Sequence, residues 1–236
     1  MKISIVFPVH NEYENLKQLI KEWDDKLRKL NNLSFEFVLV EDGSTDGTKG
    51  LIKELEKNYP ILNLSSEKKR GYTRAVIEGI YSSSGNYILC TDSDNQIKVD
   101  SLIENIENFP RDQSFLIGFR NPRKDSLNRI LYSQLFKILH NILFNSKLRD
   151  PSCPFVIGQK ETFELLPKDH LNMMTEGFWW GFVGICKKKN INFKEVPIVH
   201  YKRRRGVAGY GLVSLPGIIV RNVFGLLKIK FSKINY

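Results

Sequence analysis

The sequence predicts an α/β protein of one domain, in which a doubly wound, mainly parallel sheet is flanked by helices. Two observations lead to this prediction. Short apolar runs of β type alternate with longer segments whose apolar residues recur at helical spacing. Polar, glycine-containing motifs follow several of the strand-like runs, which is where open α/β sheets bind ligands. At 236 residues, 42% of them hydrophobic, the chain is long enough to bury one such core.

The first half of the chain supplies the strands and helices in strict alternation. In chain order, we expect strand 2–7, helix 13–30, strand 35–40, a helix that opens at Ser44 or Thr45, strand 61–64, helix 72–83 and strand 86–91. The first three elements form a βαβ unit, which implies that their strands are parallel.

The strand at 86–91 leads directly into Asp92-Ser93-Asp94-Asn95-Gln96. Two carboxylates one residue apart at a strand end supply hard oxygen ligands at the edge of the sheet. Mg²⁺ or Mn²⁺ bound by one or two carboxylates usually completes its shell with water and phosphate oxygens, so the motif predicts a cation that bridges the protein to a diphosphate. Asp-x-Asp also occurs in ordinary turns and caps.

Other strand ends carry polar motifs as well. Pro8-Val9-His10-Asn11-Glu12 follows the first strand and Asp42-Gly43-Ser44-Thr45-Asp46-Gly47-Thr48 follows the second. Asp42 can accept a hydrogen bond from a nucleotide base, and the amides that open the next helix can meet an anion. Arg70-Gly71 precedes the helix that contains Arg74, as in a diphosphate site or a simple basic turn.

The net charge of +10 is concentrated near the end of the chain, since no acidic residue follows Glu195. A segment that carries only positive charges suits binding to nucleic acid, to a phosphorylated substrate or to an anionic membrane surface, or is simply a solvated surface. Aliphatic rather than aromatic residues follow the basic cluster, which favours the membrane over nucleic acid. Three scattered cysteines support neither a disulfide framework nor a zinc site, which indicates a reducing, cytoplasmic environment.

Two apolar segments are candidates for membrane contact. Residues 127–143 read as a core helix, or as a helix that rests on lipid headgroups between basic flanks. We divide the chain into a domain at 1–211 and a basic amphipathic segment at 212–236, which we interpret as an interfacial helix rather than one docked on the domain. No apolar stretch approaches the roughly 18 residues that span a bilayer, and the start reads as a strand rather than a signal peptide. We therefore expect a peripheral protein on the cytoplasmic face of the membrane.

Taken together, the motifs resemble family 2 glycosyltransferases of the GT-A fold. The resemblance rests on Pro8-Val9-x-Asn11-Glu12, Val40-x-Asp42-Gly43-Ser44-x-Asp46-Gly47-Thr48, Arg70-Gly71-x-x-x-Ala75 and Asp92-Ser93-Asp94-x-Gln96. Downstream, the chain is similar to the dolichyl-phosphate mannosyltransferase or polyprenyl-phosphate branch. The matching segments are Gly118-Phe119-Arg120-Asn121-Pro122-Arg123-Lys124-Asp125, Arg129 four residues before Ser133, Arg149-Asp150-x-x-Cys153-x-Phe155, and Glu195-Val196-Pro197-Ile198 with Arg203 and Gly206.

The resemblance implies a role for each matching residue. By this resemblance, the nucleotide pocket contains Pro8, Asn11, Glu12, Gly71 and Arg74, and Asp42 contacts the base. Asp92 is implied to lie near ribose and diphosphate, and Asp94 to hold the divalent cation with Gln96 and Asp92. Phosphate is implied to be bound by Arg120, Arg129 and Arg203. Guanidinium groups suit that role because they form bidentate bonds with phosphate oxygens at any working pH.

The implied activity is inverting, metal-dependent transfer of a sugar from a GDP- or UDP-linked donor, and the acceptor is left open. A polyprenyl phosphate is already anionic near neutral pH and needs no strong base. A hydroxyl acceptor in polysaccharide or glycolipid synthesis needs a base, for which Asp150 or Glu176 is a candidate, although each also suits a cap or an ion pair. The acceptor-side motifs depart from the branch at Ile97-Lys98-Val99, Val156 and Ala208.

Two further alternatives are weaker, and two features remain open. A nucleic-acid-binding module leaves Asp92 and Asp94 unexplained, and an inactive sugar-nucleotide sensor leaves the arginines unexplained. Trp179 and Trp180, beside Glu176, suit either stacking on a sugar or packing in the core. The oligomeric state is also open.

Overall fold

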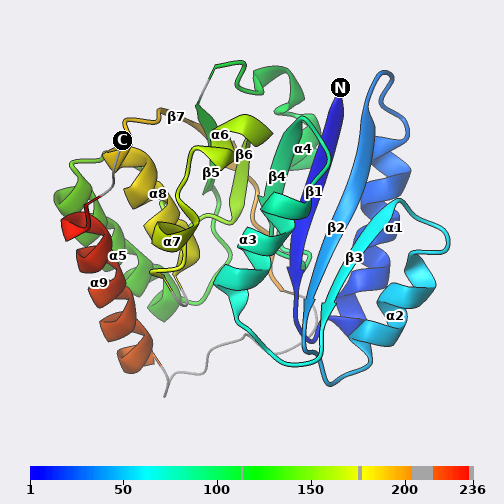
Figure 1. Cartoon of the computed structure of the whole chain (residues 1–236), viewed down its shortest axis with the longest axis horizontal. Coiled ribbons are helices and arrows are strands. Elements are labelled where there is room, and N and C mark those ends of the chain that lie inside the picture. The colour runs from blue at the N-terminus through cyan, green and yellow to red at the C-terminus, as the bar shows by residue number, and fades with distance from the viewer. Residues whose placement is uncertain (113, 175–176, 204–214, 234–236) are drawn as a thin grey trace.

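The computed structural model contains a seven-stranded sheet with helices on both faces (Figure 1). It describes residues 1–112, 114–174, 177–203 and 215–233. The strands are β1 (Lys2–Val9), β2 (Ser34–Asp42), β3 (Ile61–Ser66), β4 (Tyr87–Thr91), β5 (Phe115–Arg120), β6 (Phe155–Gln159) and β7 (Phe193–Ile198). Their order across the sheet is β3-β2-β1-β4-β6-β5-β7.

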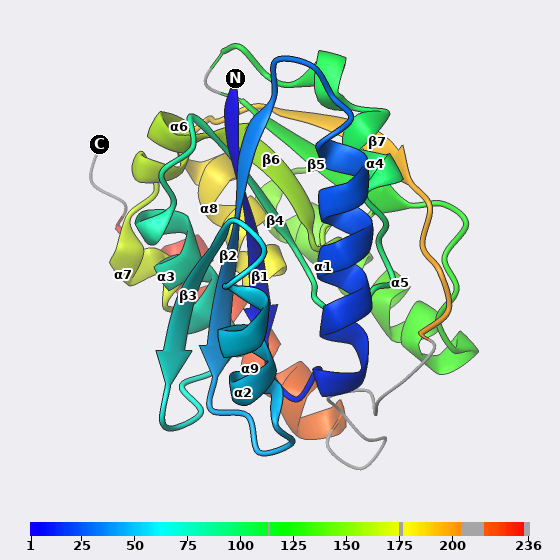
Figure 2. The same cartoon turned by 90° about the vertical axis from the view of Figure 1, so that its right-hand side faces the viewer.

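Neighbouring strands of this sheet are parallel except where β6 is involved. β6 runs antiparallel to both β4 and β5, whereas β1 pairs parallel with β2 and β4, and β5 pairs parallel with β7. The carboxyl ends of the parallel strands therefore meet at one edge of the sheet, at the bottom of Figure 2. This arrangement confirms the predicted mainly parallel, doubly wound sheet.

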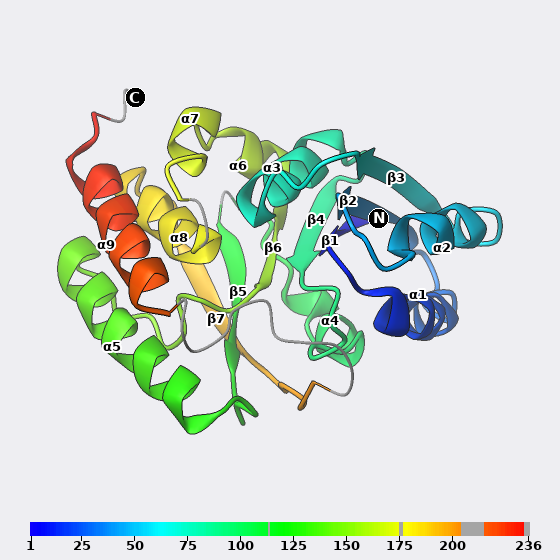
Figure 3. The same ribbon diagram turned by 90° about the horizontal axis from the view of Figure 1, so that it is seen from below.

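Helices cover the sheet in two layers with two separate apolar cores. α1 (Tyr13–Leu27), α2 (Thr48–Leu55), α4 (Asp100–Ile103) and the 3₁₀ turn η1 (Ile106–Asn108) contribute to one core. α3 (Tyr72–Ser82), α5 (Leu127–Phe144), α6 (Lys160–Glu164), α7 (Lys168–Leu171), α8 (Phe178–Lys188) and α9 (Leu215–Phe231) belong to the other (Figure 3).

The predicted elements of the first half are all present, with shifted ends. The helix expected at 13–30 ends at Leu27, and the helix expected to open at Ser44 or Thr45 begins at Thr48. The later start has a local cause: Asp46 Oδ1 accepts hydrogen bonds from the Thr48 amide (3.1 Å) and hydroxyl (2.5 Å). Gly47 takes the N-cap position with a φ of 90°, a backbone conformation that favours glycine.

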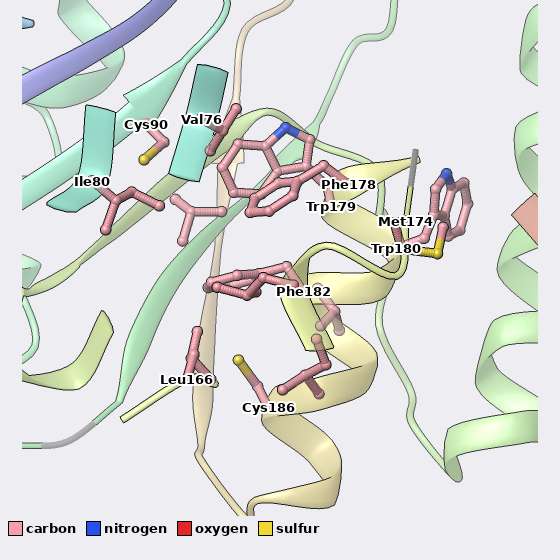
Figure 4. Close-up of a cluster of buried hydrophobic side chains, with 14 of the residues drawn as sticks. Val76, Ile80, Cys90, Leu166, Met174, Phe178, Trp179, Trp180, Phe182 and Cys186 are labelled. Atoms are coloured by element: carbon pink, nitrogen blue, oxygen red, sulfur yellow. The ribbon is translucent and has the colours of Figure 1, made fainter. Parts of the chain in front are cut away.

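Trp179 and Trp180 open α8 and pack in the core rather than at the surface. Figure 4 shows the two indoles directed to different sides of the helix, with Trp179 toward Val76 of α3. Trp180 lies against α5, with its ring centroid 5.3 Å from that of Phe136. Both side chains are buried, so packing, and not an open stacking platform, describes them in this structure.

The C-terminal helix α9 is docked on the domain, contrary to our interpretation of a purely interfacial helix. Leu226 and Ile229 are fully buried, and α9 packs against α8 and α5. Lys188 of α8 donates from Nζ to the carbonyl oxygens of Ile229 (2.8 Å), Lys230 (3.0 Å) and Ser232 (2.6 Å), which ties down the end of α9. Val220 and Phe224, on the other side of α9, remain exposed.

Candidate active site

A small polar cavity lies where the carboxyl end of β4 meets the segments that follow β5 and β7. Its volume is about 90 Å³. It is lined by Asp92, Asp94, Gln96, Ile97, Arg120, Asp125, Arg129, Pro154, His200 and Arg203. The fold thus brings together the two aspartates, the glutamine and the three arginines that the sequence singled out, although Arg203 lies more than 100 residues beyond the aspartates in the chain.

Asp92 and Asp94 are crowded into a site with little solvent. Burial, and then the Asp94 carboxylate, raises the pKa of Asp92, and burial also raises the pKa of Asp94 although the Gln96 amide donates to its Oδ1 (3.1 Å). Two largely buried carboxylates so close together repel each other when both are ionised, and a bound cation would relieve that repulsion.

The residues present fit a cation that keeps part of its shell for substrate. Among the described residues, no cluster of three or more His, Cys, Asp or Glu side chains is placed to hold a metal ion. Gln96 donates from Nε2 to the Tyr201 carbonyl (2.9 Å), so its amide oxygen is the atom left for a ligand. Two carboxylates and one amide oxygen suit Mg²⁺ or Mn²⁺ with water and phosphate as further ligands, and do not suit a closed structural site.

Arg120 is held by a bidentate ion pair with Asp150. Its Nε and Nη2 donate to the two Asp150 oxygens over 2.7 and 2.9 Å, and Nη2 also donates to Ser152 Oγ (2.5 Å). Burial opposes ionisation of Asp150, but Arg120 outweighs burial and holds the pKa of that carboxyl well below its usual range. A carboxylate with so low a pKa is a weak base, so the geometry favours the ion-pair role for Asp150 over the general-base role.

The other two predicted arginines are also paired with carboxylates. Arg203 donates from Nη2 to Glu12 Oε1 (2.6 Å), and its Nη1 lies 3.6 Å from Asp94 Oδ2. It therefore links the loop after β1 to the Asp-x-Asp motif. Arg129 is 45% exposed, with Nη1 3.4 Å from Asp125 Oδ1. Exposed arginine pairs contribute little to stability, which leaves Arg129 available for an anionic ligand.

The predicted nucleotide residues lie along the same edge of the sheet. Both oxygens of Asp42 accept backbone amides, those of Arg70 (2.6 Å) and Gly71 (2.8 Å), so this carboxylate fixes the loop before α3. A Cβ on Gly43 would lie 2.5 Å from the Lys69 nitrogen, which explains the glycine in that loop. Asn11 accepts from the Thr45 amide (2.8 Å).

The remaining predicted residues fall into three cases. The Pro8 carbonyl accepts from the Ser93 hydroxyl (2.7 Å), which joins the first strand to the Asp-x-Asp motif. Arg74 is exposed on α3. Glu176 lies outside the described residues, so its assignment as a base stays a prediction.

Two titratable residues of the cavity, Asp125 and His200, were given no role from the sequence. Asp125 lies within ion-pair distance of three guanidinium groups, those of Arg120 (3.8 Å), Arg123 (2.6 Å) and Arg129 (3.4 Å). His200 is buried and its Nδ1 accepts from the Lys124 amide (3.3 Å), while burial, and then Arg120, lowers its pKa to about 4. The position of Asp125 among basic residues was a sequence signal for its role, whereas nothing near His200 marked it.

A second cavity of about 280 Å³ lies on the other side of Arg120. It is lined by Phe119, Arg120, Asn121, Arg123, Ile130, Ser133, Gln134, Lys137, Arg149 and Asp150, and is therefore basic. The helix α5 that forms one wall presents an exposed apolar stripe to solvent, made of Leu127, Leu131, Leu135, Ile138 and Ile142. A cationic cavity beside such a stripe suits a ligand with an anionic head and an apolar chain.

Comparison with known proteins identifies the family. The family model described as Glycosyl transferase family 2 matches residues 4–167. The chain belongs to glycosyl transferase family 2. This family 2 chain is 34% identical over 213 residues to the dolichol-phosphate mannosyltransferase of Pyrococcus furiosus, an alignment that covers 87% of the chain and 58% of that protein. It is 27% identical over 214 residues to the bactoprenol glucosyl transferase of Shigella phage SfV, covering 89% of the chain and 66% of that protein.

The relatives agree with the branch that the motifs predicted, and this family 2 chain spans 58–66% of their length. Solved structures agree on the GT-A fold. Glucosyl-3-phosphoglycerate synthase from Mycobacterium tuberculosis, in complex with Mn²⁺, UDP and glucosyl-3-phosphoglycerate, superposes with a TM-score of 0.67 at 17% identity, covering 99% of this chain and 81% of that one. Mannosyl-3-phosphoglycerate synthase from Rubrobacter xylanophilus superposes with a TM-score of 0.63 at 12% identity, covering 100% of this chain and 77% of that one.

Proposed function

We propose that this protein transfers a sugar, with inversion, from a GDP- or UDP-linked donor to the phosphate of a polyprenyl-phosphate lipid at a membrane surface. One observation supports this proposal above all: a single cavity is lined by two carboxylates at a strand end and by three arginines from separate segments. Carboxylates suit a cation on the donor diphosphate, and the arginines suit a second phosphate group beside it. The names of the relatives point to the same kind of acceptor.

On the donor side, residues of the first half bind and orient the nucleotide. Pro8, Asn11 and Glu12 line its pocket at the end of β1, and Asp42 fixes the loop that carries Gly71 while its remaining lone pairs meet the base. Asp94, Asp92 and Gln96 would hold a divalent cation, which when bound neutralises charge on the departing diphosphate.

On the acceptor side, Arg120 and Arg129 orient the lipid phosphate. One of its anionic oxygens attacks the anomeric carbon from the face opposite the diphosphate, the bond from that carbon to the diphosphate oxygen breaks, and its electron pair departs with the nucleoside diphosphate. Since the attacking oxygen is already ionised near neutral pH, no protein base is needed. Arg203, between Glu12 and Asp94, is placed to stabilise charge on the leaving group.

The exposed apolar side chains of α5 and α9 form the surface that we assign to the membrane. Figure 3 shows the two helices side by side along one edge of the molecule, and they contact each other. Val220, Phe224 and Phe231 of α9 are exposed, as is the α5 stripe, with Arg221, Lys228 and Lys230 on α9 itself. Apolar residues flanked by cations suit an anionic leaflet, here the cytoplasmic one. No helix among the described residues is long and apolar enough to span a bilayer.

Turnover with defined substrates tests the proposal. The purified protein would be incubated with Mn²⁺ and a panel of GDP- and UDP-sugars, with and without undecaprenyl or dolichyl phosphate, and released nucleoside diphosphate measured. The expected result is release that requires one donor, the cation and the lipid phosphate together. Release that requires a hydroxyl acceptor instead would overturn the acceptor assignment and direct attention to Glu176, and no release with any pair would contradict the proposed activity.

A further inference from the structure

The first turn of α3 carries a hydrogen-bonded tyrosine to which the proposed function gives no role. Tyr72 Oη donates to Asp92 Oδ1 over 2.6 Å, and Trp179 Nε1 donates to Tyr72 Oη over 2.9 Å. The three side chains come from α3, the end of β4 and the first turn of α8. Trp179 is buried, and Figure 4 shows it directed toward α3. The chain of hydrogen bonds therefore ends on one of the two aspartates that line the small cavity.

The direction of these hydrogen bonds is fixed by the groups involved. An indole nitrogen can only donate, and a phenol has one proton to give. Because the Tyr72 oxygen receives the Trp179 proton, its own proton is directed to the carboxylate of Asp92. A short hydrogen bond to a carboxylate is among the stronger ones in proteins. Oδ1 is thus occupied, and within the part of the chain that the structure describes no hydrogen bond reaches Oδ2, the oxygen left for a ligand.

The turn that carries Tyr72 is itself anchored at both ends. Immediately before it, the amides of Arg70 and Gly71 donate to Asp42, the predicted base contact. Immediately after it, the Thr73 hydroxyl donates to the Met174 carbonyl over 2.6 Å, close to the start of α8. The position of the Tyr72 ring is therefore set by the nucleotide side of the site and by α8 together, which gives the tyrosine a rigid base from which to hold Asp92.

We propose that Tyr72, held in place by Trp179, is the positioning residue that selects the Asp92 rotamer and so presents Oδ2 to the cation and diphosphate of the donor. This inference rests on the proposed function for the role of Asp92, but not for the geometry that Tyr72 imposes. It gives Trp179 a structural task at the donor site, in place of the sugar stacking considered from the sequence.

Nucleotide binding to variants tests the inference without turnover. Isothermal titration calorimetry in the presence of Mn²⁺ would measure the affinity of the unmodified protein and of Tyr72→Phe for GDP and for UDP. We expect Tyr72→Phe to bind about tenfold more weakly, because a hydrogen bond to a charged group is lost. Trp179→Phe, which keeps the Tyr72–Asp92 bond, should weaken binding only about threefold. Tyr81→Phe is the matched control, since Tyr81 lies on the same helix and donates to the Leu166 carbonyl instead (3.2 Å); it should bind like the unmodified protein.

A double-mutant comparison shows whether Tyr72 acts through Asp92. In an Asp92→Ala background, Tyr72→Phe should have no further effect on binding. Weakening of the same size in both backgrounds, or unchanged binding in Tyr72→Phe alone, would overturn the inference. If Tyr72→Phe folds poorly because the Trp179 N–H has lost its acceptor, the double variant Tyr72→Phe/Trp179→Phe removes donor and acceptor together and replaces it in the comparison.

Crystal structures of the ligand-free protein and of Tyr72→Phe separate this inference from the proposed function. We expect the Asp92 carboxylate to leave its position in Tyr72→Phe and to keep it in Tyr81→Phe. An Asp92 side chain that stays in place in Tyr72→Phe would overturn the inference whether or not a nucleotide binds. Failure of the unmodified protein to bind either nucleotide would count against the proposed donor site alone, because the two structures would still decide the role of Tyr72.

Discussion

The two halves of the molecule hold their charged residues by different means. In the first half, two carboxylates of the predicted nucleotide loop are held by backbone amides: Asp42 by the amides of Arg70 and Gly71, and Asp46 by those of Thr48 and Tyr13. In the second half, charged side chains hold one another, as in the Arg120–Asp150 pair. In both halves separate segments have to meet, since Asp42 and Arg70 lie 28 residues apart and Arg120 and Asp150 lie 30 residues apart. The proposed donor site in the first half therefore relies on turns that direct backbone amides, and the proposed acceptor site in the second half relies on the conformations of paired side chains.

The two halves also differ in how many large apolar side chains they expose. Among the described residues, the large exposed apolar side chains of the first half are Met1 and Tyr13, whereas most of those of the second half lie along α5 and α9. A donor is a soluble nucleotide sugar, but a lipid acceptor has to be met where its chain lies. Under the proposed function, this difference corresponds to recognition of the nucleotide by the first half and contact with lipid by the second.

The largest expected effect is that of Asp94→Asn in the donor half. The substitution removes one charge from the cation site and should lower metal-dependent turnover about a thousandfold or more. It also relieves the repulsion between Asp94 and Asp92, so the melting temperature should stay unchanged or rise. Turnover and thermal unfolding measured together check both parts, with Asp100→Asn, which removes the surface ion pair to Lys26, as control. Undiminished activity in Asp94→Asn would show that the cation role is wrong.

Arg120→Lys should separate the two halves kinetically. Lysine keeps the charge but loses the bidentate geometry, so kcat/KM for the lipid phosphate should fall about a hundredfold while the affinity for the nucleotide changes about twofold or less. Arg111→Lys, at an exposed position by a different cavity, is the matched control. Equal losses in nucleotide affinity and in kcat/KM for the lipid phosphate would contradict the assignment of donor and acceptor to different halves.

The same difference explains what the sequence could predict. The strands and helices of the first half and the Asp-x-Asp site follow from periodicity and from motifs within a few residues of each other. The ion pair of Asp150 with Arg120 depends on a tertiary contact, which no local pattern records. The docking of α9 was misjudged because both sides of this helix are apolar, so a stripe through Phe224 could be traced although Leu226 and Ile229 face the core.

A smaller effect is expected at the lipid surface. Replacing Leu135 on α5 and Phe224 on α9 by Glu should reduce binding to vesicles that contain anionic lipid about tenfold to a hundredfold, because apolar contacts are lost and negative charge is added. Both side chains are exposed, so the melting temperature should hardly change. Cosedimentation measures the binding, with Leu165→Glu, an exposed position near α6, as control. Binding that survives in the double variant would remove the membrane contact from this face.

The smallest expected effect concerns acid, and it places pH sensitivity of folding in the second half. His140 on α5 is fully buried beside the Trp180 carbonyl (Nε2 to oxygen, 3.1 Å), and burial lowers its pKa to about 4. A lowered histidine pKa means that the unfolded chain binds the proton more readily. This contribution to stability is therefore present above the unfolded pKa of about 6.5 and is lost as the pH falls toward 4.

Denaturant unfolding of the unmodified protein and of His140→Gln, at pH 7 and pH 5, isolates the contribution of His140 to the free energy of unfolding. The raised pKa values of Asp92 and Asp94 act in the opposite sense, since those groups bind protons more readily when folded, so the slope of the unmodified protein alone does not identify His140. Between the two pH values, the unmodified protein should lose about 1–2 kcal/mol more unfolding free energy than His140→Gln, which cannot titrate there. Parallel losses in the two proteins would mean that His140 is protonated in the folded state, and the acid sensitivity would then have to come from another group.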